Sequence, residues 1–236
     1  MKFTAILAEI FFPRRCLGCG SGIKQGAVCR ACFTGIPVNK TFFCGECGGE
    51  LPIAMKICHP RAPCLIGGAG PYDNPALKAL IHNLKFRNAH EAAEPLAELM
   101  ATFLLSAMPG LDRRSAGGDP YHLLAIPLSR ERFFERGYNQ TVEIAARLAA
   151  KVSLPLATDW LSKPKHTKPQ VATGDLQERQ ENLSGCFRTT NPTGIAGKKI
   201  ILVDDVATSG STFAEAAKTL KAAGAKRVIG IAAAKA

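Results

Sequence analysis

Residues 200–212 read IILVDDVATSGST, and this stretch decides the fold. The apolar run Ile200–Val203 predicts a buried strand that delivers Asp204 and Asp205 to the carboxyl edge of a sheet, where open α/β folds bind their ligands. The hydroxyl and glycine residues that follow begin a helix expected over about Ser211–Ala223, and a helix start offers backbone N–H groups to an anion. The stretch therefore predicts a phosphate site beside two carboxylates that suit ribose hydroxyls.

The rest of the C-terminal three quarters repeats the strand and helix patterns of an α/β domain. Further strands are expected at Leu123–Ile126 and Arg227–Ile231, and helices from Pro75 onward, over about 95–108 and over about 139–151. The connection Arg130–Gln140 carries three arginines and an amide, which fit a pyrophosphate clamp or, alternatively, a solvated loop. Residues 161–182 are polar, basic and broken by two prolines, so we expect a lid that is mobile until Lys163, Lys165 and their neighbours close over a polyphosphate.

Eight of the nine cysteines lie between Cys16 and Cys64. Three C-x-x-C pairs among them are typical of zinc ribbons, because two thiolates two residues apart can face one ion. We expect two structural Zn²⁺ sites with the ligands Cys16, Cys19, Cys29, Cys32, Cys44, Cys47, Cys58 and Cys64. Three groupings of the pairs are open; the sequential one closes the shortest loops, and His59 could replace Cys58. The predicted domains are a zinc module over 1–66 and an α/β domain over 67–236.

The net charge of +11 favours polyanionic ligands such as pyrophosphate or nucleic acid over basic partners. Eight zinc-bound thiolates and two Zn²⁺ ions would lower it to about +7. The apolar N-terminus is interrupted by Glu9 and has no small-residue cleavage site before Pro13, so a short amphipathic helix is expected there rather than a signal peptide. No run reaches the roughly 20 apolar residues of a membrane span, and we expect a cytoplasmic protein.

In this order the motifs resemble the ComF family of phosphoribosyltransferase-like proteins, which is associated with DNA uptake in natural competence. The resemblance covers nearly the whole chain. Besides the cysteines and residues 200–212, it rests on Leu84-Lys-Phe86, Ile126-Pro-Leu128, Glu135-Arg-Gly-Tyr-Asn-Gln140, Thr167-Lys-Pro-Gln170, Glu178-Arg179, Asn182 and Phe187. It implies a type I phosphoribosyltransferase-like parallel sheet flanked by helices, with a small N-terminal double zinc-ribbon domain.

The resemblance also implies a ligand, phosphoribosyl pyrophosphate (PRPP) carried with Mg²⁺. Asp204 and Asp205 would then hold the ribose hydroxyls, and Lys163 and Lys165 would act in catalysis. The other implied contacts are Ala207, Thr208, Ser209, Gly210, Ser211 and Thr212 for the 5′-phosphate, and Pro127, Leu128, Ser129 and Arg130 for pyrophosphate. Where the family has arginines, Lys163 and Lys165 keep the charge but lose bidentate geometry; Ser209 replaces a threonine and keeps its hydroxyl.

Two functions compete on this basis. The first is a transferase that moves phosphoribosyl from PRPP to an unidentified acceptor in DNA uptake. The alternative is a non-catalytic protein that senses PRPP or binds single-stranded DNA, together with proteins of the competence machinery. An acceptor pocket is expected from the zinc module, the helices at 74–108 or a partner. A purely structural adaptor would leave Asp204–Thr212 unexplained.

Overall fold

The computed structural model describes residues 13–51, 58–59, 62–111, 119–164 and 185–236. Within these residues one seven-stranded sheet has the order β2-β1-β3-β9-β8-β4-β5. Its strands are β1 (Phe42–Cys44), β2 (Glu50–Leu51), β3 (Leu65–Pro71), β4 (Tyr121–Ala125), β5 (Leu156–Ala157), β8 (Lys199–Ala207) and β9 (Arg227–Lys235). The five strands from β3 to β5 are parallel, whereas β1 and β2 continue the β3 edge antiparallel. Strands β6 (Leu161–Ser162) and β7 (Arg188–Thr189) form a separate antiparallel pair.

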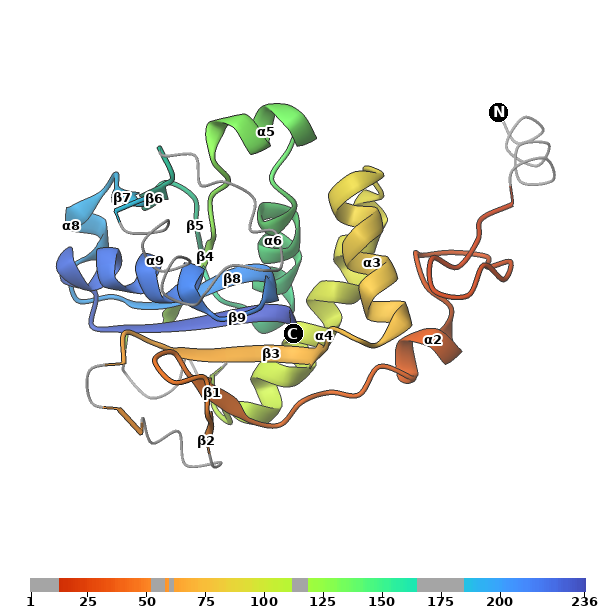
Figure 1. Ribbon diagram of the computed structural model, residues 1–236, viewed down its shortest axis with the longest axis horizontal. Helices are drawn as coiled ribbons and strands as arrows, with labels where there is room; N and C mark the ends of the chain where they lie inside the picture. Colours follow the sequence, from red (N-terminus) through yellow and green to blue (C-terminus); the bar gives the residue numbers. More distant parts are fainter. Residues whose placement is uncertain (1–12, 52–57, 60–61, 112–118, 165–184) are drawn as a thin grey trace.

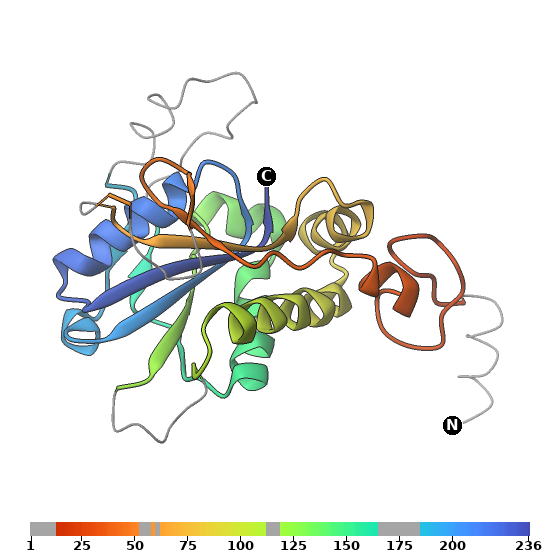
Figure 2. The same cartoon turned by 90° about the horizontal axis from the view of Figure 1, so that it is seen from below.

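Helices lie on both faces of this sheet (Figures 1 and 2). Helices α4 and α6 pack on one face, with α3 against α4, and α9 packs on the other face. The described helices are α2 (Arg30–Thr34), α3 (Pro75–Phe86), the 3-10 turn η1 (His90–Ala92), α4 (Ala93–Ala107), α5 (Arg130–Arg136), α6 (Gln140–Val152), α8 (Pro192–Ile195) and α9 (Ser211–Ala222). The predicted α/β fold is therefore confirmed.

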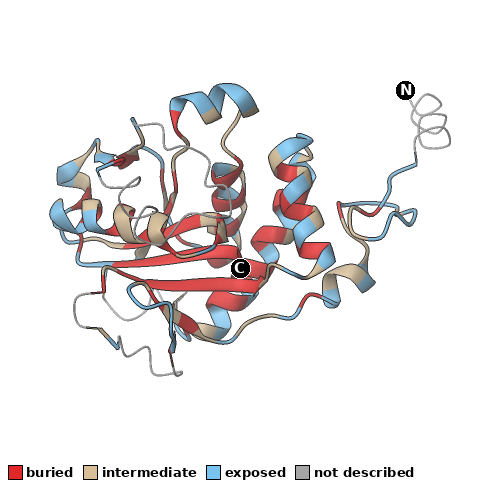
Figure 3. Cartoon of the chain, viewed as in Figure 1, coloured by how far each residue is buried: buried red, intermediate tan, exposed pale blue. Residues whose placement is uncertain are grey.

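Two cores lie on the two sides of the central strands, which are buried over most of their length (Figure 3). Successive residues of a strand point to opposite faces, so Ile201 and Val203 of β8 join the core under α4 and α6. Ile200 and Leu202 of the same strand join the core under α9. This two-sided burial explains why the sequence of β8 begins as a continuous apolar run.

The predicted helices and strands of the α/β domain are found within a few residues of their expected ends. Helix α3 begins where Asn74 accepts hydrogen bonds from the backbone N–H groups of Ala76 and Leu77, at 3.1 Å each. None of the helices in the described ranges is long and apolar enough to span a membrane.

The structure corrects two local expectations. The connection after Pro127 is not an irregular loop, because residues 130–136 form α5 between a capping Ser129 and a left-handed Gly137. Strand β8 does not end at Val203, because Asp204 and Val206 still pair with Ala232 and Ala234 of β9. The two acids therefore lie within the strand.

The cysteine-rich region is joined to the sheet. Strand β1 pairs with β3 from Phe42 opposite Gly67 to Cys44 opposite Leu65, and the Phe42 ring packs edge-on against Phe103 of α4, 5.3 Å between centroids. The predicted boundary between residues 66 and 67 falls inside β3, so a division there cuts a strand. A domain boundary remains a prediction of the sequence.

Candidate functional site

A cavity of about 400 Å³ opens at the carboxyl edge of the parallel strands. Its walls come from the segment after β4, from α5, from the start of α6, from β8 and from the start of α9, and Tyr72 and Lys85 close it from the side of α3. Lining residues that the sequence had assigned to the site are Pro127, Leu128, Ser129, Lys163, Asp204, Asp205, Thr208 and Thr212. The structure thus brings three separated segments of the predicted site into one cavity.

Asp205 is held by two side chains that the predicted site did not include. The Lys85 ammonium lies 2.7 Å from one carboxylate oxygen, and the Gln140 amide nitrogen donates to the other at 2.9 Å. Asp205 is buried, so these partners offset the loss of its hydration. Gln140 lines the cavity, and its side-chain oxygen is buried without a hydrogen-bond partner in the described residues.

The Tyr138-Asn-Gln140 motif forms hydrogen bonds to three other segments of the chain around Asp205. The Tyr138 hydroxyl donates to the Leu84 carbonyl at the end of α3, and the Asn139 amide donates to the Ile126 carbonyl at 3.1 Å. The next residue, Gln140, reaches Asp205. The motif therefore positions the ends of α3 and β4 against β8.

Asp204 is half-buried and lines the same cavity. Burial and the neighbouring charge of Asp205 raise its pKa to about 7, although Lys85 lowers it in part. A carboxyl group poised near neutrality can carry charge when a ribose offers hydroxyl donors and stay protonated when the site is empty. The Asp205 backbone N–H donates to the Asp204 carboxylate at 2.8 Å, which fixes its orientation.

The raised pKa predicts that Asp204 destabilises the free protein at alkaline pH. The folded state keeps a proton that the unfolded state releases near pH 4, so stability falls as the pH rises from about 4 to about 7, and the full cost is present above pH 7. Asp204→Asn should therefore raise the midpoint of thermal unfolding at pH 8, by about 2–4 °C for each kcal/mol recovered, and leave it unchanged at pH 4. Thermal unfolding at the two pH values tests this. An equal or lower midpoint at pH 8 would contradict it.

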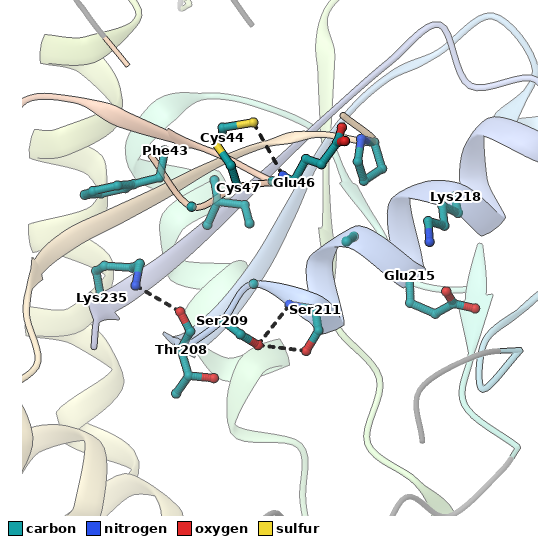
Figure 4. A pocket seen from close by; sticks show the side chains of 16 residues that line it. Phe43, Cys44, Glu46, Cys47, Thr208, Ser209, Ser211, Glu215, Lys218 and Lys235 are labelled. Carbon is teal, nitrogen blue, oxygen red and sulfur yellow. Dashed lines mark hydrogen bonds between the residues drawn. The ribbon is translucent and has the colours of Figure 1, made fainter. Parts of the chain in front are cut away.

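The loop after β8 separates the first cavity from a second one. Gly210 adopts a left-handed conformation, φ +78°, immediately before α9, and a side chain there would meet Ile66. Thr212 lines the first cavity and Thr208 lines both, whereas Ser209, Gly210 and Ser211 line the second, and Ala207 is buried. The Ser209 and Ser211 hydroxyls are 3.0 Å apart at this turn, and the helix start beside them offers backbone N–H groups to a phosphate (Figure 4).

The second cavity, about 510 Å³, lies between this loop and the cysteine-rich region (Figure 4). Residues 43–48 form one wall, and α9 with Lys235 forms the other. The Lys235 ammonium donates to the Thr208 carbonyl at 2.9 Å and lies 5.7 Å from the centre of the Phe43 ring. The zinc module therefore borders the predicted phosphate loop, one of the three positions expected for an acceptor pocket.

The cationic side chains of the site differ in part from the prediction. Lys163 lines the first cavity; burial and the nearby charge of Arg132 lower its pKa, and Asp204 and Cys186 offset this in part. Arg132 and Arg136 line the cavity, whereas Arg130 is exposed and lies over the Phe134 ring instead. Lys165 and the rest of the expected lid, up to residue 182, lie outside the described residues.

Two clusters of side chains fit two zinc sites. The ligand atoms of Cys16, Cys19, Cys29 and Cys32 lie within 4.8 Å of one another, and so do those of Cys44, Cys47, Cys58 and His59. Sulfur separations of 3.8 Å for Cys19–Cys29 and 3.6 Å for Cys47–Cys58 are near the roughly 3.8 Å that a tetrahedral Zn²⁺ with 2.3 Å bonds requires.

One predicted ligand differs. His59 completes the second cluster, with Nδ1 3.2 Å from the Cys58 sulfur, whereas Cys64 lies in the apolar core at the start of β3. Burial raises the pKa of the Cys64 thiol to about 12, which favours the protonated form. Conversely, although burial alone would raise it, backbone N–H groups lower the pKa of Cys44 to about 6.

Sequence reasoning missed Lys85 as a site residue, and it left the arginines and the amide of residues 130–140 open between a pyrophosphate clamp and a solvated loop. Lys85, Arg132, Arg136 and Gln140 all lie within or beside the motifs that carry the family resemblance. The order of these motifs along the chain was the feature of the sequence that could have identified them. Nothing in their spacing, however, tied the end of α3 to Asp205.

Comparison with known proteins assigns both parts of the chain. Residues 139–235 match the phosphoribosyl transferase domain family, and residues 7–64 match the double zinc ribbon domain family. Competence protein F of Haemophilus influenzae is 30% identical over 228 residues, which cover 92% of this chain and 95% of the relative. The chain belongs to the ComF family. DNA utilization protein YhgH of Salmonella typhimurium is 31% identical to this ComF-family chain over 217 residues, with 87% and 89% covered.

Solved structures similar to this ComF-family chain are more distant. A hypoxanthine phosphoribosyltransferase from Staphylococcus aureus is 12% identical, with 61% of this chain and 63% of that chain covered and a TM-score of 0.35. An adenine phosphoribosyltransferase from Thermoanaerobacter pseudethanolicus is 17% identical, with 63% and 68% covered and a TM-score of 0.33. Similarity at this level says nothing about the ligand of the present chain.

Proposed function

We propose that this protein binds PRPP with Mg²⁺ in the cavity at the carboxyl edge of the sheet and transfers its phosphoribosyl group to an acceptor in DNA uptake. The observation that carries the proposal is the convergence of a carboxylate, a half-buried lysine and a helix start on one cavity: Asp204, Lys163, and Thr208 with Thr212. A ribose between two phosphate groups needs these three kinds of contact. The family relatives named for competence and DNA utilization support the biological setting.

In the proposed reaction an acceptor nitrogen forms a bond to C1′ of PRPP while the bond from C1′ to pyrophosphate breaks. Pyrophosphate leaves with the electron pair, and the acceptor releases its proton to solvent. Bound Mg²⁺ would neutralise part of the pyrophosphate charge. Lys163, Arg132 and Arg136 are the side chains of this chain that can stabilise the charge that grows on the leaving oxygen. No residue has to act as a nucleophile.

The roles of the two carboxylates follow from their contacts. Asp205 is already paired with Lys85 and Gln140, so we assign it to fixing the site as well as to the ribose. Asp204 has no ion pair of its own in the described residues and is the freer acceptor for a ribose hydroxyl. Its raised pKa means that PRPP binding should strengthen as the pH rises through about 7.

Lys163→Ala should lower turnover more than it lowers affinity for PRPP. The half-buried ammonium meets a pyrophosphate charge that develops in the transition state, so we expect a loss of about 10- to 100-fold in pyrophosphate release and a smaller change in the dissociation constant. Calorimetry with Mg²⁺ and PRPP measures affinity, and pyrophosphate release is followed against nucleobases and single-stranded DNA as acceptors. Lys226→Ala, an exposed lysine at the amino end of β9, is the matched control.

The rival function makes the opposite prediction in the same assays. A non-catalytic PRPP sensor or DNA-binding accessory protein would bind PRPP without releasing pyrophosphate to any acceptor. Lys163→Ala would then weaken binding alone. Saturable pyrophosphate release with one acceptor would select the transferase.

A further inference from the structure

An unusual surface lies beside the cavity, where α5 stands next to the end of α3 (Figure 1). Among the described residues, five large hydrophobic side chains are exposed, and three of these are phenylalanines of this one region: Phe86 at 62%, Phe133 at 47% and Phe134 at 71%. Helix α5 has no buried residue at all. Aromatic rings exposed together to this extent mark a binding surface rather than a core.

Arginines lie over two of these rings. The guanidinium carbon of Arg136 is 5.6 Å from the centre of the Phe86 ring, and that of Arg130 is 5.6 Å from the centre of the Phe134 ring. Such contacts attract the cations to the ring faces, by about 0.5–1 kcal/mol at exposed sites. We call the five residues Phe86, Phe133, Phe134, Arg130 and Arg136 the α5 surface.

The charge around the α5 surface is positive. Residues 85–87 and 130–136 contain five basic side chains and two acidic ones, Glu131 and Glu135. A protein partner that buried the phenylalanines would have to bring an apolar face together with several acidic groups. A single-stranded nucleic acid supplies both an apolar face and a negative charge in every nucleotide, since each base has a face that can stack and each phosphate is an anion. A double helix hides those base faces.

The α5 surface continues into the cavity. Arg136 contacts the Phe86 ring on the outside and also lines the cavity, and Lys85, the residue before Phe86, pairs with Asp205. A strand stacked on the phenylalanines would therefore pass the mouth of the proposed PRPP site.

We propose that the α5 surface binds single-stranded nucleic acid by stacking bases on Phe86, Phe133 and Phe134, with Arg130 and Arg136 contacting the phosphates. This binding does not require PRPP turnover. It adds to the proposed function a defined surface that holds a polymer of bases next to the PRPP cavity.

The test is fluorescence anisotropy of a labelled oligothymidylate of about 16 nucleotides with the full-length protein. The triple change Phe86→Ala, Phe133→Ala and Phe134→Ala should weaken binding at least about tenfold, because base stacking is lost. The triple change to tyrosine should retain binding within about twofold, and the triple change to leucine, which keeps apolar area without a ring, should lose it. Arg130→Gln should reduce the slope of log affinity against log salt by about 0.7.

Leu105→Ala is the matched control. Leu105 is another exposed hydrophobic residue, but it lies near the far end of α4, about 18 Å along that helix from its start beside α3. It should bind the oligonucleotide like the unchanged protein. Calorimetry with Mg²⁺ and PRPP on the same proteins shows that the phenylalanine variants are folded, since none of the three rings lines the cavity.

Three results of the binding assay would each overturn the proposal: no oligonucleotide binding by the unchanged protein, equal binding by the triple alanine variant, or binding by the leucine variant equal to that of the tyrosine variant. A dimer that the alanine changes abolish would assign the surface to a second copy and also overturn it. If the α5 surface fails these tests but the protein binds PRPP, the proposed function stands and only the nucleic-acid surface is refuted. If the protein binds the oligonucleotide but not PRPP, the nucleic-acid surface stands and the proposed function is refuted.

Discussion

Replacing Asp204 and Asp205 together with asparagine is expected to weaken PRPP binding by about 100-fold or more. Charge-assisted hydrogen bonds are worth about 1.5–3 kcal/mol each, and two of them to the ribose hydroxyls account for such a loss. The two changes differ in what else they disturb. Within the described residues the Asp204 carboxylate accepts a hydrogen bond from the Asp205 backbone and has no ion pair, whereas Asp205 is the partner of Lys85 and Gln140.

The experiment is calorimetry with Mg²⁺ and PRPP on both single variants and the double variant. Asp204→Asn should lose affinity while gaining thermal stability at pH 8, a combination typical of a residue that is kept for binding. Asp205→Asn should lose both, because the partly buried Lys85 ammonium is left without its anion. Asp119→Asn, an exposed acid before the amino end of β4, is the control. Unchanged affinity in a folded double variant would refute the assignment of the site.

The α/β core could be predicted because each of its segments shows a single hydrophobic pattern, either a continuous apolar run or helical spacing. The run Ile200–Val203 is apolar since both faces of β8 are covered, and α6 shows helical spacing since only one of its faces is. The end of β8 was placed too early because Asp204 is polar. A strand can carry polar residues where it leaves the core and borders a cavity. Its backbone continues to pair with the neighbouring strand there, as β8 does with β9.

Helix α5 and the contacts of Lys85 were beyond such reasoning for different reasons. Helix α5 buries no residue, so it has no apolar spacing to recognise, and its only local signals are the caps Ser129 and Gly137. The ion pair between Lys85 and Asp205 joins two elements that are far apart in the sequence. Pairing of β1 with β3 likewise depends on a three-residue strand, too short for any pattern to specify a partner.

The two zinc clusters should differ in how much of the protein depends on them. Cys19 and Cys47 are both exposed members of a cluster, so Cys19→Ser and Cys47→Ser are a matched pair. Each should remove one of two Zn²⁺ ions found by elemental analysis. Structural zinc contributes about 10–16 kcal/mol to the folding of small zinc modules, so each change should unfold its own module.

Of the two clusters, the second includes a residue of the seven-stranded sheet. Its loss should therefore affect the stability of the α/β domain as well as that of its own module. Its Cys44 ends β1, which pairs with β3 and brings Phe42 against Phe103. Cys47→Ser should therefore expose the β3 edge and lower the unfolding midpoint of the α/β domain by about 2–4 °C for each kcal/mol lost. Cys19→Ser should lower it less, because the described residues around the first cluster add side chains such as Ala27 to the core but no strand to the sheet. Thermal unfolding and limited proteolysis measure this difference.

The same preparations decide between His59 and Cys64 as the fourth ligand. His59→Ala should lose one Zn²⁺ ion, whereas Cys64→Ser should keep two, because the Cys64 thiol lies in the core outside the cluster. Cys64→Ala, which adds no polar atom to that core, guards against loss of metal through misfolding. One Zn²⁺ lost from both Cys64 variants, with two retained by His59→Ala, would restore the cysteine as the ligand. Equal midpoints for Cys19→Ser and Cys47→Ser would show that the α/β domain is stable without its β1 edge.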